Sequence, residues 1–340
     1  MSDGPYDLVA VGEVLIDLIS DEIVLALREA EGFHRFLGGE VSNVAWNVSA
    51  LGGQVAVVAC IGDDGFGTYL RHEMESAGIC VDGLRVTSLA PTSVAVNARQ
   101  TRTPDFIIYR GADAHISLDD VDMDTIKASR IVHTSAFGLS REPARSTILQ
   151  VLKSAHQNGC LTSLDPNYHP RIWPDITDFR GMLEKAYRWV DVTKPSLEDC
   201  ERLLGNGKTP VEYLRYFLNL GPEIVALTMG SSGVLLGTMD GEMSHIRPSD
   251  IDVADVTGAG DAFWSGLLLA LLDGYAPDEA ACLGQIVAEA KIGTVGPIPK
   301  MPDRTGLYRK LREIKDAAIA EPPSEWWAER VNSRSASRVR

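Results

Sequence analysis

The sequence predicts an α/β fold in which helices cover both faces of a central, mostly parallel sheet. Short, almost wholly apolar runs alternate along the 340-residue chain with longer amphipathic segments. This alternation is typical of parallel strands joined by helices. Glycine or polar residues directly follow several of the apolar runs, and open parallel sheets bind their ligands at that edge.

Five apolar runs have the length and composition of buried strands. The strands are predicted over Tyr6–Val11, Val55–Ile61, Ile131–Thr134, Leu161–Leu164 and Val225–Thr228. Amphipathic spacing in the segments between and after these runs predicts helices. The helices are predicted over Asn43–Leu51, Gly67–Ala77, Ala144–Asn158, Ser196–Leu204 and Asp303–Ala320.

Two segments break the alternation, one near residues 20–38 and the other near residues 92–113. The second alternates apolar and polar residues on either side of Thr103-Pro104-Asp105, which predicts a β-hairpin with two unlike faces. Residues 321–340 end in an Arg- and Ser-rich stretch, which predicts a partly disordered C-terminal tail. Within this tail we expect Trp326-Trp327 to dock back on the body of the protein.

Composition narrows the classes of function. The net charge of −15 disfavours nucleic acid and anionic membrane surfaces as partners. The five cysteines occur singly, which is typical of reduced thiols in a cytoplasmic protein. The chain starts with polar residues rather than a signal peptide, and no apolar run approaches the ~20 residues of a membrane span.

The most informative motif is Gly258-Ala259-Gly260-Asp261, at the start of a long apolar run. Glycines leave backbone amides open to an anion, and the first turn of a helix binds phosphate through unpaired N–H groups. Asp261 would lie beside that anion and accept a proton from an attacking hydroxyl. An anion hole with a neighbouring base serves phosphoryl transfer to an alcohol. The position at a helix start predicts a lowered pKa for Asp261.

This motif is part of the stretch DVTGAGDAF at residues 255–263, which resembles the C-terminal signature of the PfkB (ribokinase-like) carbohydrate kinases. Val256 is its one departure from the usual form. Five further blocks follow the order and spacing of that family, so that the resemblance covers roughly residues 7–300. These blocks are GGEVSN at 38–43, GDDGFG at 62–67, DPN at 165–167, KPS at 194–196 and TMGSSG at 228–233.

The resemblance implies a ribokinase-like three-layer α/β sandwich with a small β-sheet lid. Residues 1–320 would form one sugar kinase domain, and the lid would come from about 20–38 and 92–113. A lid over the sugar excludes water that would otherwise accept the phosphoryl group, and in this family it often joins two subunits into a homodimer. The implied cofactors are ATP and Mg²⁺, with a monovalent cation as a further candidate.

The resemblance also assigns roles at the phosphoryl-transfer centre and on the sugar side. Asp261 would be the catalytic base, and the amides of Gly258, Ala259 and Gly260 would bind the γ-phosphate. The candidate sugar-binding residues are Asp17, Gly38, Gly39, Asn43, Arg110, His169 and Arg171. Three of them have plain structural alternatives: Asp17 as an exposed acid at a strand end, Asn43 as a helix cap, and Arg110 as a solvated cation.

On the nucleotide side, the residues that match family positions are Asn167, Lys194, Thr228, Gly230 and Gly233. The family's magnesium-linked N-x-x-E motif reads Ser196-x-x-Asp199 in this chain. Asp199 is therefore only a weak candidate for a metal ligand, and the sequence leaves the metal site unassigned.

The expected reaction is transfer of the γ-phosphoryl group of ATP to a primary hydroxyl of a sugar, with fructokinase as the first choice. A 2-keto-3-deoxygluconate kinase is the first alternative, and a ribokinase or nucleoside kinase the second. His169 stands where relatives that act on fructose or 2-keto-3-deoxygluconate carry an arginine, and Arg171 lies two residues further on. A 6-phosphofructokinase is less favoured, because no basic cluster for a phosphosugar is apparent near the lid. A sugar-binding regulator without catalysis is the alternative outside enzymes.

Overall fold

The computed structural model describes residues 5–99, 105–249, 251, 258–293 and 303–327. Within these residues a ten-stranded sheet forms the centre of the protein, with the strand order β14-β13-β12-β11-β10-β9-β8-β1-β4-β5. Neighbouring strands from β11 through β10, β9, β8, β1 and β4 to β5 pair in parallel. The strands from β11 to β14 pair antiparallel and form one edge of the sheet.

The first half of this sheet comprises β1 (Leu8–Val11), β4 (Val55–Gly62), β5 (Cys80–Thr87), β8 (Ile131–Ser135) and β9 (Leu161–Asp165). The second half comprises β10 (Val192–Thr193), β11 (Ile224–Thr228), β12 (Val234–Thr238), β13 (Met243–Ile246) and β14 (Ile319–Ala320). Side chains of β1 and β4 alternate between two separate apolar clusters, one on each face of the sheet. This alternation is why the predicted strand runs are apolar throughout.

Helices cover both faces, as the sequence predicts. One face carries α1 (Glu40–Ala50), α2 (Gly65–Ser76), α8 (Ala259–Leu272), α9 (Pro277–Ile292) and α10 (Arg304–Ala318). The other face carries α3 (Met123–Ala128), α4 (Ala144–Gln157), α5 (Ile176–Ala186), α6 (Leu197–Leu204) and α7 (Pro210–Leu218). The α8 helix is apolar all round and buried along almost its whole length, because α1 and α9 pack against it and its side chains join those of the sheet in one apolar cluster.

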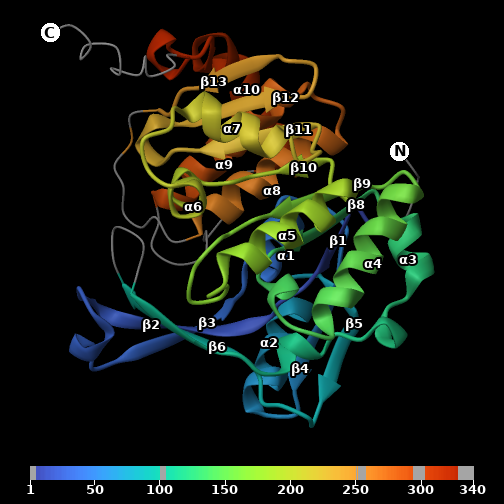
Figure 1. Cartoon of the computed structure of the whole chain (residues 1–340). Coiled ribbons are helices and arrows are strands. Elements are labelled where there is room, and N and C mark those ends of the chain that lie inside the picture. The colour runs from blue at the N-terminus through green and yellow to red at the C-terminus, as the bar shows by residue number, and fades with distance from the viewer. Residues whose placement is uncertain (1–4, 100–104, 250, 252–257, 294–302, 328–340) are drawn as a thin grey trace, which may run out of the picture.

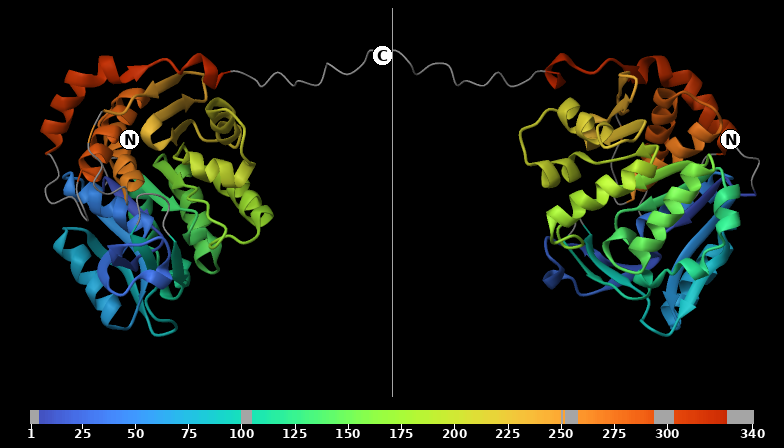
Figure 2. Two further views of the ribbon diagram at one scale, coloured as in Figure 1. Left: turned by 90° about the vertical axis from the view of Figure 1, so that its left-hand side faces the viewer. Right: turned by 45° about the vertical axis from the view of Figure 1, so that its right-hand side comes forward.

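A second, four-stranded sheet stands apart from the main one, with the order β3-β2-β6-β7 (Figure 1). It comprises β2 (Leu15–Ile23), β3 (Phe33–Gly38), β6 (Val94–Arg99) and β7 (Phe106–Tyr109). The β6 and β7 strands form the predicted hairpin, although most of its turn (100–104) lies outside the described residues. The two views of Figure 2 show this sheet at the opposite end of the protein from α10.

The predicted ribokinase-like α/β fold with a small separate sheet is therefore confirmed. Of the predicted helices, the C-terminal one is α10, and the chain after it reaches Trp327 within the described residues. Trp326 and Trp327 both contact the body, as expected. In the parts of the chain that the structure describes, every helix is too short or too polar to cross a membrane.

The close packing of α8 against α9 requires glycine at position 284. A Cβ atom there would lie 2.6 Å from the Phe263 carbonyl oxygen, which is backbone and cannot move aside cheaply. We predict that Gly284→Ala lowers the free energy of unfolding by about 1–3 kcal/mol, measured by urea denaturation.

The matched control for this substitution is Gly181→Ala in α5, where an added Cβ meets no atom within 4 Å. Because glycine weakens a helix interior, this control should raise the free energy of unfolding by about 0.5–1 kcal/mol. Equal effects of the two substitutions would show that the α8–α9 contact does not depend on glycine.

Candidate active site

The first turn of α8 has the form of an anion site. Gly258 precedes the helix with a φ of 74°, in the left-handed region that favours glycine. Ala259 and Gly260 then begin the helix, whose first N–H groups have no partner within it. The remainder of the motif, Asp255 to Thr257, lies outside the described residues. The predicted roles of Gly258, Ala259 and Gly260 therefore have suitable backbone geometry.

Asp261 lies in this first turn and faces α1. The Asn43 side chain donates a hydrogen bond from Nδ2 to Asp261 Oδ2 over 2.8 Å. Asn43 is the fourth residue of α1, so its side chain does not cap that helix. The structure thus brings together a predicted sugar ligand and the predicted base, which lie 218 positions apart in the sequence.

The prediction of a lowered pKa for Asp261 is wrong. Burial raises the pKa of its carboxyl, although the positive charge of Lys194 and the hydrogen bond from Asn43 oppose that shift. The helix start favours the carboxylate, but desolvation and the nearby Asp165 favour the protonated form. A raised pKa makes Asp261 a stronger proton acceptor than the sequence indicates.

Lys194 forms an ion pair with Asp165, whose Oδ2 lies 2.6 Å from Lys194 Nζ. Both side chains are buried, with exposures of 6% and 4%. Burial alone would lower the pKa of Lys194, but the carboxylates of Asp165, Asp261 and Glu40 raise it above its usual value. Lys194 therefore remains a cation beside the start of α8, where a Cβ on Gly260 would lie 3.4 Å from its Nζ.

Glu40 is the first residue of α1 and is almost fully buried. Its two carboxyl oxygens lie 3.0 and 3.1 Å from Nε2 of the buried His133. The indole of Trp264, which can only donate, donates to His133 Nδ1 over 3.3 Å. Since Nδ1 accepts, Nε2 carries the proton of the neutral ring and donates it to Glu40. Burial lowers the pKa of His133 to about 4, which keeps the ring neutral.

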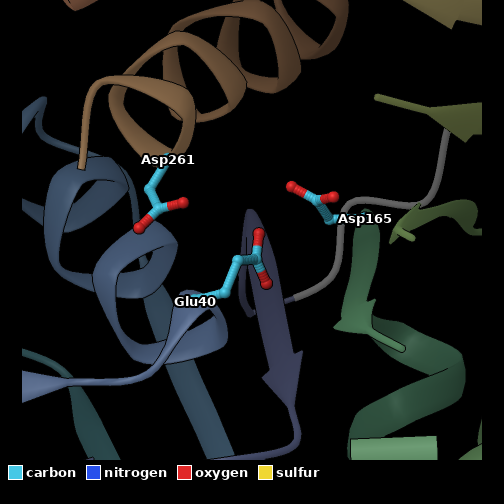
Figure 3. Close-up of side chains that lie close together, drawn as sticks. All are labelled: Glu40, Asp165 and Asp261. Carbon is cyan, nitrogen blue, oxygen red and sulfur yellow. The ribbon is translucent and has the colours of Figure 1, made fainter. Parts of the chain in front are cut away.

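Glu40, Asp165 and Asp261 point into one space from three separate elements, as Figure 3 shows. One carboxyl oxygen of each lies within 4.8 Å of the other two. Carboxylate oxygens are the ligands that Mg²⁺ prefers, so this group fits a divalent cation by the chemistry of its donors. The same arrangement concentrates negative charge. Burial, together with repulsion from Asp165 and Asp261, therefore raises the pKa of the Glu40 carboxyl well above its usual range.

The predicted sugar side begins at Asp17 in β2. Asp17 Oδ1 accepts a hydrogen bond of 2.9 Å from Asn97, and burial raises its pKa to about 7. A Cβ on Gly38 would overlap the Asp17 carboxylate, so this close approach requires glycine. Gly39 has a φ of 102° and directly precedes α1. Asp17 is therefore a partly buried acid within the small sheet rather than a solvated one.

The three predicted basic contacts to substrate all have partners within the protein. Arg110 is buried in an ion pair with Asp113, donates to Ser140 Oγ over 2.7 Å and lies over the Phe137 ring. It is therefore not a solvated cation.

The other two basic residues pack on the lid hairpin. The His169 ring packs against the Phe106 ring with the centroids 4.5 Å apart and the planes tilted by 59°, and burial lowers the pKa of His169 to about 4. Arg171 donates to Asp105 over 3.0 Å and to the Phe106 carbonyl. The segment after β9 that contains His169 and Arg171 is thus attached to the small sheet.

The predicted nucleotide residues lie on neighbouring strand ends. Thr228 ends β11, and its N–H donates to the Pro195 carbonyl over 3.0 Å, next to Lys194. Gly230 and Gly233 flank a tight turn with φ values of 55° and 80°. Asn167 has a φ of 33°, and its N–H donates to Asp165 Oδ1 over 3.0 Å. The Lys194–Asp165 pair therefore joins these segments.

Asp199 lies outside the carboxylate group of Figure 3. Its Oδ2 accepts hydrogen bonds from the N–H and the hydroxyl of Ser196 at 3.0 and 2.6 Å. The two residues form a reciprocal capping box at the start of α6. This structural role accounts for the Ser-x-x-Asp spacing without a metal.

Three buried polar residues that the sequence analysis left without roles belong to this site: Glu40, His133 and Asp165. Asp165 and Glu40 both lie inside motifs that the sequence analysis singled out. Asp165 directly follows a predicted strand and Glu40 directly follows two glycines, and a charged residue at either position is a usable signal of a functional site. His133 lies within a run predicted to be a buried strand, and its role depends on Trp264 and Glu40, which are remote in sequence.

A helix start that is open to an anion, a buried carboxyl group beside it and a separate small sheet fit a phosphotransferase that acts on an alcohol group. The family model described as pfkB family carbohydrate kinase matches residues 6–304. The chain belongs to this family and is a kinase that acts on a sugar hydroxyl.

Three known proteins show the range of its relatives. The ATP-dependent 6-phosphofructokinase of Thermoanaerobacterium thermosaccharolyticum is 35% identical over 301 residues, which cover 88% of this chain and 92% of the relative. A solved fructokinase from Halothermothrix orenii is 34% identical with a TM-score of 0.72, covering 85% of this chain and 99% of that one. An uncharacterized sugar kinase from Pyrococcus horikoshii in complex with ATP is 26% identical with a TM-score of 0.77, covering 90% and 99%.

The buried Glu13 provides a test of the electrostatics next to this site. The residue is 1% exposed, and burial raises the pKa of its carboxyl from 4.5 to about 8. Between these values the folded protein holds a proton that the unfolded chain releases, so the folded state loses stability as the pH rises. We predict that Glu13→Gln reduces this loss between about pH 5 and pH 8, by up to about 1.4 kcal/mol per pH unit.

The measurement is urea denaturation of both proteins at several pH values. Glutamine keeps the size of the side chain and can still accept from Ser135 Oγ, which lies 2.9 Å from both Glu13 oxygens. Stability profiles that run parallel over this pH range would contradict the raised pKa.

Proposed function

We propose that this chain is an ATP-dependent fructokinase, which transfers the γ-phosphoryl group of ATP to a primary hydroxyl of fructose. We choose a neutral sugar because of the ion-pair partners and charge of the three basic residues predicted to contact the substrate. Asp113 neutralises Arg110, Asp105 neutralises Arg171, and His169 is uncharged at neutral pH. None of these three offers a spare positive charge to a carboxylate or a phosphate on the sugar.

The proposed chemistry uses Asp261 as the base. The sugar hydroxyl oxygen forms a bond to the γ-phosphorus while the bond from that phosphorus to the β–γ bridging oxygen breaks. The hydroxyl proton passes to Asp261, and ADP leaves with the electron pair. Asn43 holds the carboxylate through its 2.8 Å hydrogen bond. The amides at the start of α8 and the Lys194 cation stabilise negative charge on the transferred group.

The proposed nucleotide site runs from the Thr228–Gly233 turn to Lys194. The ATP complex of the Pyrococcus horikoshii relative supports ATP as the phosphoryl donor. Mg²⁺ bound with ATP would neutralise part of the phosphate charge. Of the three clustered carboxylates, Glu40 and Asp165 are the proposed contacts, because Asp261 must stay free to accept a proton. Dependence on a monovalent cation stays a prediction.

The lid is the proposed contact between two subunits. The described strands and turns of the small sheet expose Ile23, Leu25, Ile107 and Tyr109, with exposures of 45–85%. Large apolar side chains exposed on a small sheet favour burial against another surface. Light scattering during size-exclusion chromatography of the purified protein would reveal the proposed homodimer as twice the 36.9 kDa of one chain.

One comparison favours a second candidate, a 6-phosphofructokinase, because the relative of that name is 35% identical over nearly the whole chain. The two functions differ in charge at the substrate. A phosphosugar would need cations in addition to the three whose charges are already neutralised.

The base assignment gives the first prediction for function. Asp261→Asn should lower kcat by about 10²- to 10⁴-fold, because the amide cannot accept the hydroxyl proton. ATP binding, measured by calorimetry, should stay close to that of the original protein. The matched control is Asp124→Asn on α3, whose side chain is 94% exposed. A kcat within about threefold of the original protein would refute the role of Asp261.

The proposed substrate gives the second prediction for function. We predict that kcat/KM with ATP and Mg²⁺ is highest for fructose among fructose, 2-keto-3-deoxygluconate, ribose, a nucleoside and fructose 6-phosphate. ADP release coupled to a spectroscopic assay measures it. A higher value for fructose 6-phosphate would establish the second candidate. Binding of a sugar without ADP release from any of them would make the protein a sugar-binding regulator.

A further inference from the structure

The chain after α10 wraps around the edge of the main sheet. Leu307 and Leu311 of α10 are buried in the apolar cluster on one face. Ile319 and Ala320 then form β14, which pairs antiparallel with β13. The chain continues into a short 3-10 helix, Ser324–Trp326, whose Trp326 packs against the apolar cluster on the opposite face. Figures 1 and 2 show this segment crossing the end of the molecule next to β13.

At the end of this segment, Trp326 packs against His245 of β13. The two rings meet edge to face, with centroids 4.6 Å apart. His245 Nε2 lies 2.8 Å from the Ser232 carbonyl oxygen. A carbonyl can only accept, so Nε2 carries a proton and donates it. The Trp326 ring therefore sets the position of an imidazole that holds the backbone of the turn after β11.

That turn is the Thr228–Gly233 segment of the proposed nucleotide site. Besides the hydrogen bond at Ser232, it contacts β13 through Gly233, where a Cβ would overlap the Ile246 carbonyl oxygen. Gly230 lies in open space by comparison, since a Cβ there meets no atom within 4 Å. The first residue of the turn, Thr228, is held by the Pro195 carbonyl. Gly230 and Gly233 leave the second half of the turn adaptable, so the position of that half depends on its contacts with β13 and His245.

We propose that Trp326 is a positioning residue for the nucleotide, acting through His245 on the turn that binds ATP. This inference rests on the proposed function, because it takes the Thr228–Gly233 turn as part of the ATP site. The segment after α10 is then a functional extension of the kinase fold: it secures β13 by strand pairing and secures the turn by a ring contact. Trp326 itself lies outside the reacting groups, so its loss should affect binding of ATP rather than the chemical step.

The experiment is steady-state kinetics of the full chain with Trp326→Ala, with fructose and ATP each varied. We expect the KM for ATP to rise about two- to tenfold, the change that loss of one aromatic pair would produce. The kcat and the KM for fructose should change by less than twofold. Trp326→Phe, which keeps an aromatic ring against His245, should restore most of the affinity for ATP.

Trp327→Ala is the matched control. Trp327 is 43% exposed and meets Arg215 of α7 rather than His245, so its variant should keep the KM for ATP of the original protein. His245→Ala gives a second test that leaves Trp326 in place and does not depend on the folding of Trp326→Ala. It should raise the KM for ATP to a similar extent, and the double variant should show no further rise.

An unchanged KM for ATP in both Trp326→Ala and His245→Ala would overturn the inference while leaving the kinase function intact. Additive effects of the two substitutions would also overturn it, because independent contributions contradict action through His245. Failure of the original protein to bind ATP, measured by calorimetry, would overturn the proposed function and this inference together.

Discussion

The buried ion pair between Lys194 and Asp165 is the interaction on which the rest of the site depends. Glu40, Asp165 and Asp261 converge from α1, β9 and α8, and burying three carboxylates together is costly without a compensating cation. Lys194 supplies it, with its Nζ 2.6 Å from Asp165. The same cation lies at the open start of α8. Loss of Lys194 would leave buried negative charge where the phosphates of ATP are proposed to bind.

The fold could be predicted from the sequence because apolar runs and helical spacing are local signals. The antiparallel edge could not, since β14 has two residues and exists only by pairing with β13. Within the site, glycine-rich motifs identified the start of α8 and Asn43. The pKa of Asp261 was predicted in the wrong direction, because burial and the charge of Asp165 depend on contacts that the sequence does not contain.

Charge balance also connects the site to the choice of substrate. Arg110, one of the basic residues predicted to face the sugar, is 6% exposed and forms an ion pair with Asp113. This ion pair ties the end of β7 to η2 (Ala112–His115) and so has a structural role. Arg171 has a similar role, because its hydrogen bond to Asp105 attaches the lid hairpin to the segment after β9. A proposed sugar site whose predicted cations are already paired suits hydroxyl groups, for which Asp17 and Asn43 offer an acceptor and a donor.

The central claim is that Asp261, held by Asn43 beside the amides of α8, receives the proton of the sugar hydroxyl. A crystal structure with fructose and a non-hydrolysable ATP analogue tests it most directly. We expect a primary hydroxyl oxygen within about 2.6–3.2 Å of an Asp261 carboxyl oxygen, with the γ-phosphate at the start of α8. A sugar bound with its hydroxyls turned away from Asp261, or a γ-phosphate bound elsewhere, would contradict this role of Asp261.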